Sequence, residues 1–383
     1  PKEEDDLAVR ANHSLRLLDG RDWGKPEAQQ YSLMRHERAV CLNTVEINLA
    51  FTTNAQPDIR RYWAVGTGFV ALEAEDSPCK GRVLVFEVVH LDADGKEVGK
   101  DAADSGTATV TLRRKWAIDS RQTRGPVTAV NCVDGKLLAA LGTTPSSVRI
   151  FRYDVRSETL LAMSFYDTPF AVVSLDVVKN YILIGDLYRS VQLVQWRADK
   201  HIFKPLAKHT KEPIKTLDAK FLLYNKNVPG IVITDGKRNL RVVYYNPISD
   251  QLQDVADIHL ATRGFQLENA AHDLTAMTIA TQDGSMHILM PLDEQLFRKL
   301  FALQAALSAF DPTNNAGLNP RALRTIRGTP IKKKNIADGD LIFKFCSLSY
   351  DSQREIAESL GTTPGKLLKD IAYIQSNIRH KFY

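Results

Sequence analysis

Six basic side chains near the C-terminal end form the part of the sequence best suited to contact another molecule. Between positions 321 and 334 no acidic residue interrupts this basic patch, whose members are Arg321, Arg324, Arg327, Lys332, Lys333 and Lys334. Such a cluster can contact nucleic-acid phosphates or an acidic partner surface. A solvated loop and a nuclear-import signal are the alternatives. No aromatic ring is interleaved, which argues against a specific reader of single strands.

The charge of the chain is concentrated at the same end. From Leu292 onward there are 14 Lys and Arg against 9 Asp and Glu, out of totals of 50 and 45, so the preceding part holds 36 of each. The formal net charge of +5 therefore belongs to the last quarter of the chain. Net positive charge localised in this way indicates an interaction region.

Motifs for catalysis or cofactor binding are absent from the sequence. The nine histidines include no H-E-x-x-H motif and no pair at metal-ligand spacing, and no G-x-x-x-x-G-K-[ST] loop occurs. The glycine pair Gly66 and Gly68 lacks the following helix that a dinucleotide site requires. We therefore predict no catalytic, cofactor-binding or metal-binding residue. A Ser-His-Asp set assembled from distant segments is the alternative that the sequence leaves open.

The cysteines and the N-terminus indicate an intracellular protein. Cys41, Cys79, Cys132 and Cys346 are scattered without a C-x-x-C pair, which favours neither a disulfide framework nor a zinc site. The acidic N-terminus does not resemble a signal peptide, and no apolar run reaches membrane-spanning length. Because the first residue is Pro1 and not methionine, we interpret the chain as a piece of a longer protein.

A strand–turn–strand unit recurs through most of the chain. Each unit has an apolar strand, a small or acidic turn and a second strand that ends in polar residues. The first strands of the units are 62–66, 136–142, 181–186, 230–236 and 276–284, and the second strands are 82–88, 148–154, 191–196, 240–245 and 286–290.

The spacing of the turns predicts the fold class. Gly142, Asp186, Asp235 and Asp283 recur at roughly 45–50 residues, the length of a four-stranded propeller blade. We predict a mainly β protein with a WD40-like seven-bladed β-propeller, complete or incomplete in this chain, followed by a small α-helical C-terminal domain. Only five or six units are visible, so further blades are either unrecognised or outside the chain. An ordinary β-sandwich is the alternative.

Two details of the units are also predicted. In the second strands, residues such as Val148 and Ile150 alternate with polar residues, so one face is expected to pack between blades and the other to meet solvent. The pairs Asp235–Gly236 and Asp283–Gly284 suit hairpin turns, because glycine tolerates positive φ.

After Pro291 the apolar period changes from two to 3.6. Leu292, Leu296, Leu300, Leu303 and Leu307 lie on one helical stripe. Further helices are expected after Asn319-Pro320, at 341–346, at 356–360 and after Thr363-Pro364. The predicted domains are thus a flexible N-terminal segment (1–30), a propeller (31–291) and a helical domain (292–383), with loop insertions at 73–81 and 91–107.

Several sequence segments resemble one known family in the same order. They are Gly81–Phe86, Gly125–Ala129, Asp235–Leu240, Met290–Glu294, Phe297–Leu300, Gly317–Arg321, Asp338–Leu341 and Gly361–Pro364. Together they resemble the last propeller and C-terminal domain of the large subunit of the cleavage and polyadenylation specificity factor. The segment Gly317–Arg321 is the most discriminating, whereas Asp338–Leu341 is shared with the large subunit of the damage-specific DNA-binding complex and a propeller subunit of a splicing factor.

The resemblance implies a function without an active site or a cofactor. It implies a nuclear scaffold for pre-mRNA 3′-end cleavage and polyadenylation, which holds a WD40-repeat subunit and a zinc-finger subunit that recognise the polyadenylation signal. The remaining propellers of the parent chain, and pre-mRNA directly or through these subunits, are the other expected partners. An adaptor in a DNA-damage, ubiquitin-ligase or splicing-factor complex is the alternative, and direct RNA binding by the basic patch is a third hypothesis.

Overall fold

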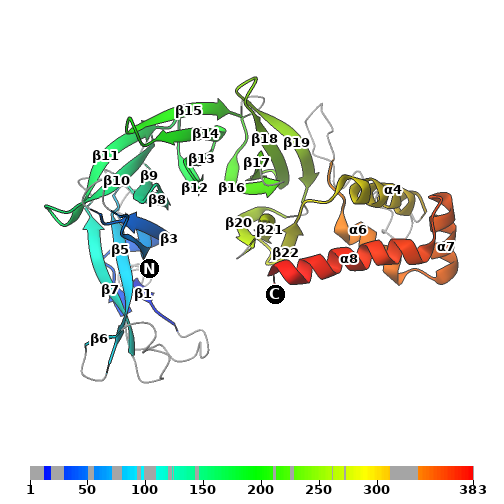
Figure 1. Cartoon of the computed structure of the whole chain (residues 1–383), viewed down its shortest axis with the longest axis horizontal. Coiled ribbons are helices and arrows are strands. Elements are labelled where there is room, and N and C mark those ends of the chain that lie inside the picture. Colours follow the sequence, from blue (N-terminus) through cyan, green and yellow to red (C-terminus); the bar gives the residue numbers. More distant parts are fainter. Residues whose placement is uncertain are drawn as a thin grey trace, which may run out of the picture. The chain divides into compact units, whose positions relative to one another are not determined.

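The structure, a computed structural model, is mainly β with helices at the C-terminal end (Figure 1). It describes residues 13–18, 30–50, 56–70, 80–92, 96–98, 109–119, 123, 125–142, 146–209, 213–224, 228–260, 262–270, 273–310 and 335–382. The chain divides into two compact units, residues 1–206 and 207–383.

The described part of the first unit contains four antiparallel sheets, of which three are propeller blades. Blade 1 consists of β3 (Glu37–Asn48), β4 (Ile59–Phe69), β5 (Val83–Leu91), β6 (Glu97–Val98) and β7 (Thr109–Ile118). Blade 2 consists of β8 (Val127–Val133), β9 (Lys136–Leu141), β10 (Ser147–Asp154) and β11 (Thr159–Asp167). Blade 3 consists of β12 (Val172–Val178), β13 (Tyr181–Asp186), β14 (Ser190–Arg197) and β15 (Ile202–Lys208), whose last residues cross into the second unit. A separate small sheet pairs β1 (Ser14–Arg16) with β2 (Gln30–Ser32).

The second unit contains two blades and the helices. Blade 4 consists of β16 (Thr216–Tyr224), β17 (Val228–Asp235), β18 (Asn239–Asn246) and β19 (Gln251–His259). Blade 5 consists of β20 (Gly264–Ala270), β21 (Asp273–Thr281) and β22 (Met286–Leu289). The helices are α4 (Glu294–Phe310), α6 (Gly339–Phe343), the 3₁₀ helix η1 (Lys344–Ser347), α7 (Tyr350–Ser359) and α8 (Pro364–Phe382).

The predicted strand pairs are confirmed, but the described residues form five blades and not seven. Blades of roughly 45–50 residues account for this number, because the β part of the chain has room for only five or six of them. Within the predicted loop insertion 91–107, Glu97 and Val98 form β6 and pair with His90 and Leu91 of β5. The predicted flexible segment 1–30 lies mostly outside the described residues, although Ser14–Arg16 form β1.

The middle strands of blade 2 are buried on both faces. The prediction that one face of these strands meets solvent is therefore wrong. Val148 and Ile150 of β10 pack toward blade 3, whereas Phe151 on the other face packs toward blade 1. The relative exposure of all three side chains is 0%. The physical reason is that blades stack face to face, so that only the blade edges and turns reach water.

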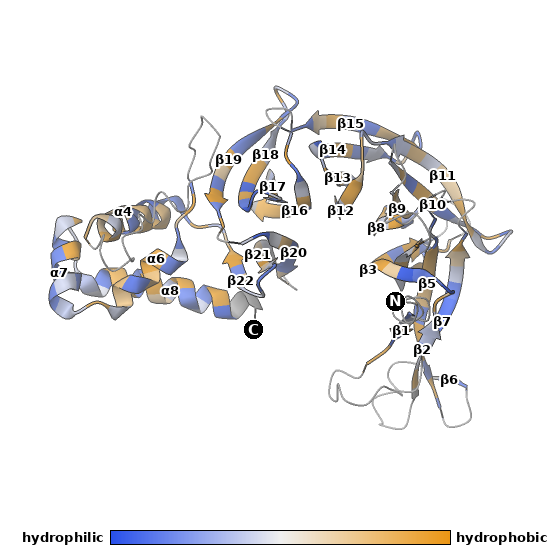
Figure 2. Cartoon of the chain, turned by 180° about the vertical axis from the view of Figure 1, so that it is seen from behind, coloured by the Kyte–Doolittle hydropathy of each residue, from blue (hydrophilic) through white to orange (hydrophobic). Residues whose placement is uncertain are grey.

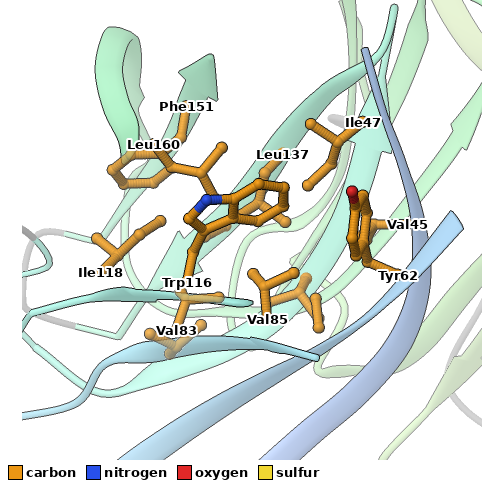
Figure 3. Close-up of a cluster of buried hydrophobic side chains, with 14 of the residues drawn as sticks. Val45, Ile47, Tyr62, Val83, Val85, Trp116, Ile118, Leu137, Phe151 and Leu160 are labelled. Carbon is orange, nitrogen blue, oxygen red and sulfur yellow. The ribbon is translucent and has the colours of Figure 1, made fainter. Parts of the chain in front are cut away.

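An aromatic cluster fills the space between blades 1 and 2. The Trp116 ring of β7 lies among Leu137, Leu160 and Val85 (Figure 3). Its centroid is 4.9 Å from that of Tyr62 in an edge-to-face arrangement, and its Nε1 donates to the backbone oxygen of Glu158 at 3.1 Å. The indole therefore buries its ring and satisfies its one polar atom, which fixes the two blades against each other.

The first strand of every described blade, in chain order, has a β-bulge near its start. The register shifts between Ala39 and Cys41, Val127 and Ala129, Val172 and Ser174, Thr216 and Asp218, and Gly264 and Gln266. The residue inside each shift has no partner on the neighbouring strand of its blade, and a bulge re-aims such a side chain. These residues are Val40, Thr128, Val173, Leu217 and Phe265.

Polar side chains on the first strands of blades 1 and 2 form hydrogen bonds to the neighbouring blade. The Nδ2 atom of Asn43 in β3 donates to Val130 O of β8 at 3.1 Å, and that of Asn131 in β8 donates to Leu175 O of β12 at 3.2 Å. The first strands of neighbouring blades are therefore joined by side-chain hydrogen bonds, in addition to the backbone hydrogen bonds within each sheet.

Replacing Asn131 with alanine is expected to lower the free energy of unfolding by about 1 kcal/mol, because the Leu175 carbonyl then loses its donor. Urea unfolding followed by tryptophan fluorescence measures the difference. Gln251→Ala, at an exposed position of β19, is the matched control and should change stability by less than about 0.5 kcal/mol. Equal effects of the two substitutions would contradict the inter-blade role.

The helices pack around one apolar cluster. Apolar and polar residues alternate along α8 (Figure 2). Leu300, Leu303 and Leu307 of α4 are buried, as the stripe predicted. The expected helix at 341–346 is divided between α6 and η1. The expected helix at 356–360 begins earlier, at Tyr350, because Ser349 caps it. Among the described residues, no helix combines the length and apolarity needed to cross a membrane.

The last helix begins and the preceding one ends as predicted. Gly361, at φ 66°, ends α7, and α8 starts at Pro364. The Thr363 carbonyl accepts from Lys366 N at 3.1 Å and from Leu367 N at 3.4 Å. Glycine can adopt this positive φ without a Cβ clash, and proline suits the first helical position because its missing N–H needs no partner there.

Candidate interaction surface

The predicted basic patch, residues Arg321, Arg324, Arg327, Lys332, Lys333 and Lys334, lies outside the described residues. The structure describes both of its flanks. α4 ends at Phe310, and Asn335 Nδ2 donates to Val255 O of β19 at 2.9 Å. Gln304 Oε1 of α4 accepts from the N–H of Asp338, the N-cap of α6, at 2.8 Å. Asn335, the first described residue after the patch, is thus anchored on blade 4.

A buried polar network supports the turn between β17 and β18. Asp235 Oδ1 accepts from the N–H groups of Lys237 and Asn239 at 2.8 and 2.9 Å, and its Oδ2 accepts from Asn239 Nδ2 at 2.9 Å. Asn239 Oδ1 in turn contacts His259 Nδ1 at 2.9 Å. Asp186 has a corresponding role in blade 3, where its Oδ1 accepts from two N–H groups of the β13–β14 turn. The recurring aspartates therefore order hairpin turns.

The prediction that Gly236 adopts a positive φ is wrong. Gly236 has an ordinary backbone conformation, and Arg238 adopts the left-handed one, with φ 70°. Gly284, in the second Asp-Gly pair, does have a positive φ of 85°. In the first turn the hydrogen bonds to Asp235 decide the path of the chain, because they fix the N–H groups on both sides of Arg238.

Asp235→Ala is expected to lower the free energy of unfolding by about 2 kcal/mol, because the buried Asn239 donors lose their acceptor. The change in the urea midpoint at constant slope measures it. The exposed Asp199, in the turn between β14 and β15, provides the control Asp199→Ala, which should be nearly neutral. A neutral Asp235→Ala variant would show that the network does not hold the turn.

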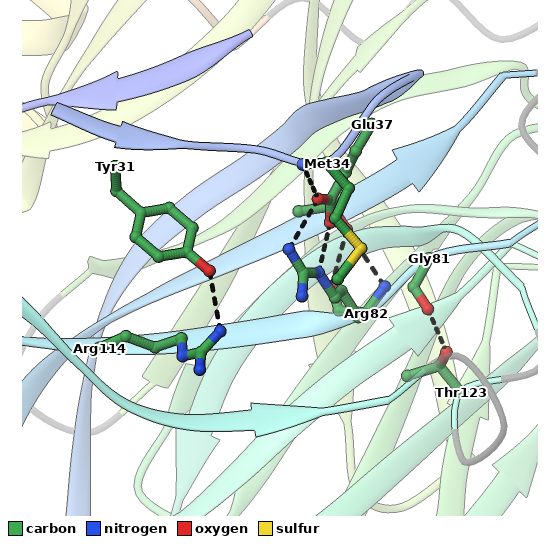
Figure 4. A network of polar contacts seen from close by, with 8 residues as sticks. Tyr31, Met34, Glu37, Gly81, Arg82, Arg114 and Thr123 are labelled. Carbon is green, nitrogen blue, oxygen red and sulfur yellow. Dashed lines mark hydrogen bonds and ion pairs between the residues drawn. The ribbon is translucent and has the colours of Figure 1, made fainter. Parts of the chain in front are cut away.

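Blade 1 contains a fully buried ion pair that sequence reasoning did not identify (Figure 4). Arg82 Nε and Nη2 donate to the two carboxylate oxygens of Glu37 at 2.6 and 2.8 Å. Thr67 Oγ1 and the N–H of Met34 donate to the same carboxylate at 2.7 and 2.9 Å. Burial raises the pKa of Glu37, but these donors outweigh it and hold the pKa below its ordinary value of 4.5.

The geometry of this ion pair indicates a structural role. The side-chain exposure is 0% for Glu37 and 6% for Arg82, and both carboxylate oxygens accept from donors within the chain. A bidentate pair with these additional donors holds β3, β4 and the start of β5 together.

Other candidates for catalysis are also buried or lack a nucleophile. His209 Nε2 contacts Asp254 Oδ1 at 3.0 Å, but the His209 side chain has 0% exposure and its Nδ1 has no hydrogen-bond partner. Among the described residues, this His–Asp pair therefore contacts no hydroxyl group through His209 Nδ1. Burial raises the pKa of the Cys41 thiol to about 12, which keeps it protonated. Within the described ranges, no group of three His, Cys, Asp or Glu side chains could hold a metal ion.

Blade 1 also has an exposed apolar face. One face packs on blade 2, and the other is covered in part by Leu33 and by Tyr31 of β2. Beyond this cover, Leu42 is 60% exposed and Trp63 is 41% exposed. Side chains of this kind on a blade face are suited to packing against another sheet.

Comparison with known proteins identifies the family. The family model described as the CPSF A subunit region matches residues 12–347. The chain belongs to this family. The match begins before β1 and ends at the last residue of η1, so it covers all five blades of this CPSF A subunit region.

The curated relatives agree with the family model. The chain is 30% identical over 327 residues to the cleavage and polyadenylation specificity factor subunit 1 of Arabidopsis thaliana, which covers 80% of this chain and 21% of the relative. It is 26% identical to the Drosophila melanogaster protein of the same name, over 83% of this chain and 22% of the relative. It is 26% identical to the protein CFT1 of Yarrowia lipolytica, over 94% of this chain and 28% of the relative. The chain thus spans between a fifth and about a quarter of these relatives.

Proposed function

We propose that this chain acts as a non-catalytic scaffold within the machinery for pre-mRNA 3′-end cleavage and polyadenylation. The match of the CPSF A subunit model to residues 12–347 is the observation that carries the proposal. The structure supports it because Glu37, Arg82 and His209 are buried and contact charged partners within the chain, the half-buried Asp254 being the partner of His209. Stacked blades with ordered turns provide a rigid surface for other subunits.

The partners are proposed from the same resemblance. The scaffold holds a WD40-repeat subunit and a zinc-finger subunit, which recognise the polyadenylation signal, and it works in the nucleus. The five blades belong to a seven-bladed propeller that is completed by other segments of the parent protein. The exposed Leu42 and Trp63 on blade 1 support this completion, and so does the outer edge of β22, which pairs with no strand among the described residues.

A pull-down of the tagged chain from nuclear extract tests the proposal. Recovery of the WD40-repeat and zinc-finger polyadenylation subunits is the expected result. Recovery of cullin-type ubiquitin-ligase subunits in their place would assign the chain to the alternative adaptor function. Asp199→Ala, at an exposed turn, is a suitable control variant that should recover the same partners.

The basic patch is proposed to contact pre-mRNA. Lys332, Lys333 and Lys334 contribute charge that RNA phosphates can neutralise, which makes affinity depend on salt. Reversal of these three charges should weaken binding of an RNA that contains the polyadenylation signal and reduce the dependence on salt. Unchanged binding would exclude the patch as the contact site.

A further inference from the structure

A second basic cluster lies at one end of blades 4 and 5, within the described part of the second unit. Lys215 precedes β16, Lys237 and Arg238 form the β17–β18 turn, and Arg263 precedes β20. All four side chains are exposed. Because neighbouring strands are antiparallel, the start of β16, the end of β17 and the end of β19 share one end of the blade. We call these four residues the rim cluster.

Backbone contacts hold the rim cluster together. Gly236 N donates to Lys215 O at 2.8 Å, and a Cβ at Gly236 would lie 3.0 Å from Lys215 Cδ, so the lysine stem covers this turn. Leu260 N donates to Arg238 O at 2.7 Å, which places the start of the link to blade 5 beside the same turn. Arg263 O accepts from Gln282 N at 2.9 Å. Asp283, which follows Gln282, accepts from Ser285 N through its Oδ1 at 3.1 Å.

Arg238 adopts a backbone conformation that is costly for a long side chain. Its φ of 70° lies in the left-handed region, where glycine or asparagine is usual. The Asp235 network and the Leu260 hydrogen bond hold it there. A strained backbone conformation persists only where surrounding contacts hold it in place, and such conformations often occur at functional positions. The turn therefore presents the Arg238 side chain from a fixed backbone position, as other turns of the described residues do for Glu158 and Lys179.

An apolar side chain lies next to these charges. Phe265 occupies the bulge of β20, two residues after Arg263, and is 68% exposed. A Cβ at Gly264 would lie 2.8 Å from Thr234 Cγ2, so the start of β20 packs on the end of β17, just before the Asp235 turn. Leu217 occupies the corresponding bulge of β16 and is half-buried. Exposed apolar surface at Phe265 thus lies next to the positive charge of the rim cluster.

We propose that the rim cluster and Phe265 bind an acidic peptide segment of a partner protein that inserts an apolar side chain among the bulge residues. Carboxylates match the guanidinium groups of Arg238 and Arg263, and an aliphatic or aromatic residue of the peptide packs on Phe265. The cluster suits a peptide better than RNA because it offers one exposed ring, whereas single-strand readers stack successive bases on several. This inference concerns a separate surface and does not rest on the proposed scaffold function.

Fluorescence anisotropy of the whole chain with a labelled probe tests this proposal. The probe is a short peptide of glutamates that flank one central leucine. The variant Lys215→Gln, Lys237→Gln, Arg238→Gln, Arg263→Gln is expected to bind it at least about tenfold more weakly, and Phe265→Ala about tenfold more weakly. Arg238→Gly alone is expected to bind about threefold more weakly while its Tm stays equal to or rises above that of the parent chain, because glycine relieves the strain.

A matched variant controls for the loss of charge. Arg152, Arg156, Lys179 and Lys200 are exposed and lie in blades 2 and 3, and their replacement by glutamine should leave binding unchanged. The proposal is overturned if the chain does not bind the probe, or if the rim and control variants bind it equally. It is also overturned if oligouridine binds through the rim cluster more tightly than the peptide does. A rim variant that loses stability is replaced by Arg238→Gly, whose fold is expected to be intact.

Discussion

Replacing Arg82 with leucine is expected to lower the free energy of unfolding at neutral pH by about 3–5 kcal/mol. The substitution leaves the Glu37 carboxylate in a site with 0% exposure and without its cationic partner. Urea unfolding at pH 7 measures the loss. The double variant Glu37→Leu, Arg82→Leu removes both charges and should recover a large part of it, since an apolar pair needs no ionic partner. A single variant as stable as the parent chain would show that the ion pair has little structural effect.

The pH dependence of stability provides a second readout of the same pair. The folded-state pKa of Glu37 is lowered below 4.5, so its contribution is fully present above the unfolded pKa. It is lost as the pH falls below about 4.5 toward the folded pKa. In Arg82→Leu the Thr67 and Met34 donors remain but the Arg82 donors are lost, so burial is less opposed and the pKa of Glu37 rises relative to that in the parent chain. The deficit should therefore be smaller at pH 4 than at pH 7. A deficit that is independent of pH would contradict this assignment.

The second large effect is expected at Gly81. A Cβ at this position would lie 2.2 Å from Thr67 O, 2.7 Å from Pro126 Cα and 2.9 Å from Gly125 O, all of which are backbone atoms. Because backbone cannot move aside like a flexible side chain, Gly81→Ala is expected to cost about 3 kcal/mol or more. Thermal unfolding measures the change.

The control for Gly81→Ala is a glycine with free space. Gly365 lies in the first turn of α8, and nothing lies within 4 Å of an added Cβ. Gly365→Ala should therefore leave stability unchanged or raise it by about 0.5 kcal/mol, because alanine has the higher helix propensity. Similar destabilisation by both substitutions would refute the close approach at Gly81.

Two of the segments that carried the family resemblance meet at this contact. Gly81 and Arg82 begin one segment, and Gly125 and Pro126 begin the other. In the structure Gly81 packs on Gly125 and Pro126, and Thr123 Oγ1 donates to Gly81 O at 2.6 Å (Figure 4). These short segments thus have a physical basis in close backbone packing between blades 1 and 2.

Local patterns in the sequence predicted the elements well. Strand alternation and turn residues identified the hairpins β9–β10, β13–β14 and β17–β18, and the leucine stripe identified α4. The helix from Pro364 followed from the proline at its first position. These features depend on residues that are close along the chain, which is why the sequence alone could predict them.

Features that depend on distant residues were missed. Glu37 and Arg82 are 45 positions apart, and neither has a local pattern that pairs it with the other. The bulge at Phe265 depends on the pairing of β20 with β21, and the left-handed Arg238 depends on the Asp235 network. The repeat length gave the period of the blades but not their total, so the described residues confirm five blades and leave the predicted seven unconfirmed. Of the candidate site, the sequence indicated the basic patch but not the rim cluster, whose four charges come from three separate links.

Reconstitution from purified parts is the measurement that tests the scaffold role most directly. The chain is mixed with the purified WD40-repeat and zinc-finger subunits of the polyadenylation factor and separated by size-exclusion chromatography. We predict that the three elute together as one complex, and that Asp199→Ala elutes in the same way. Separate elution of the folded chain from both subunits would contradict the account.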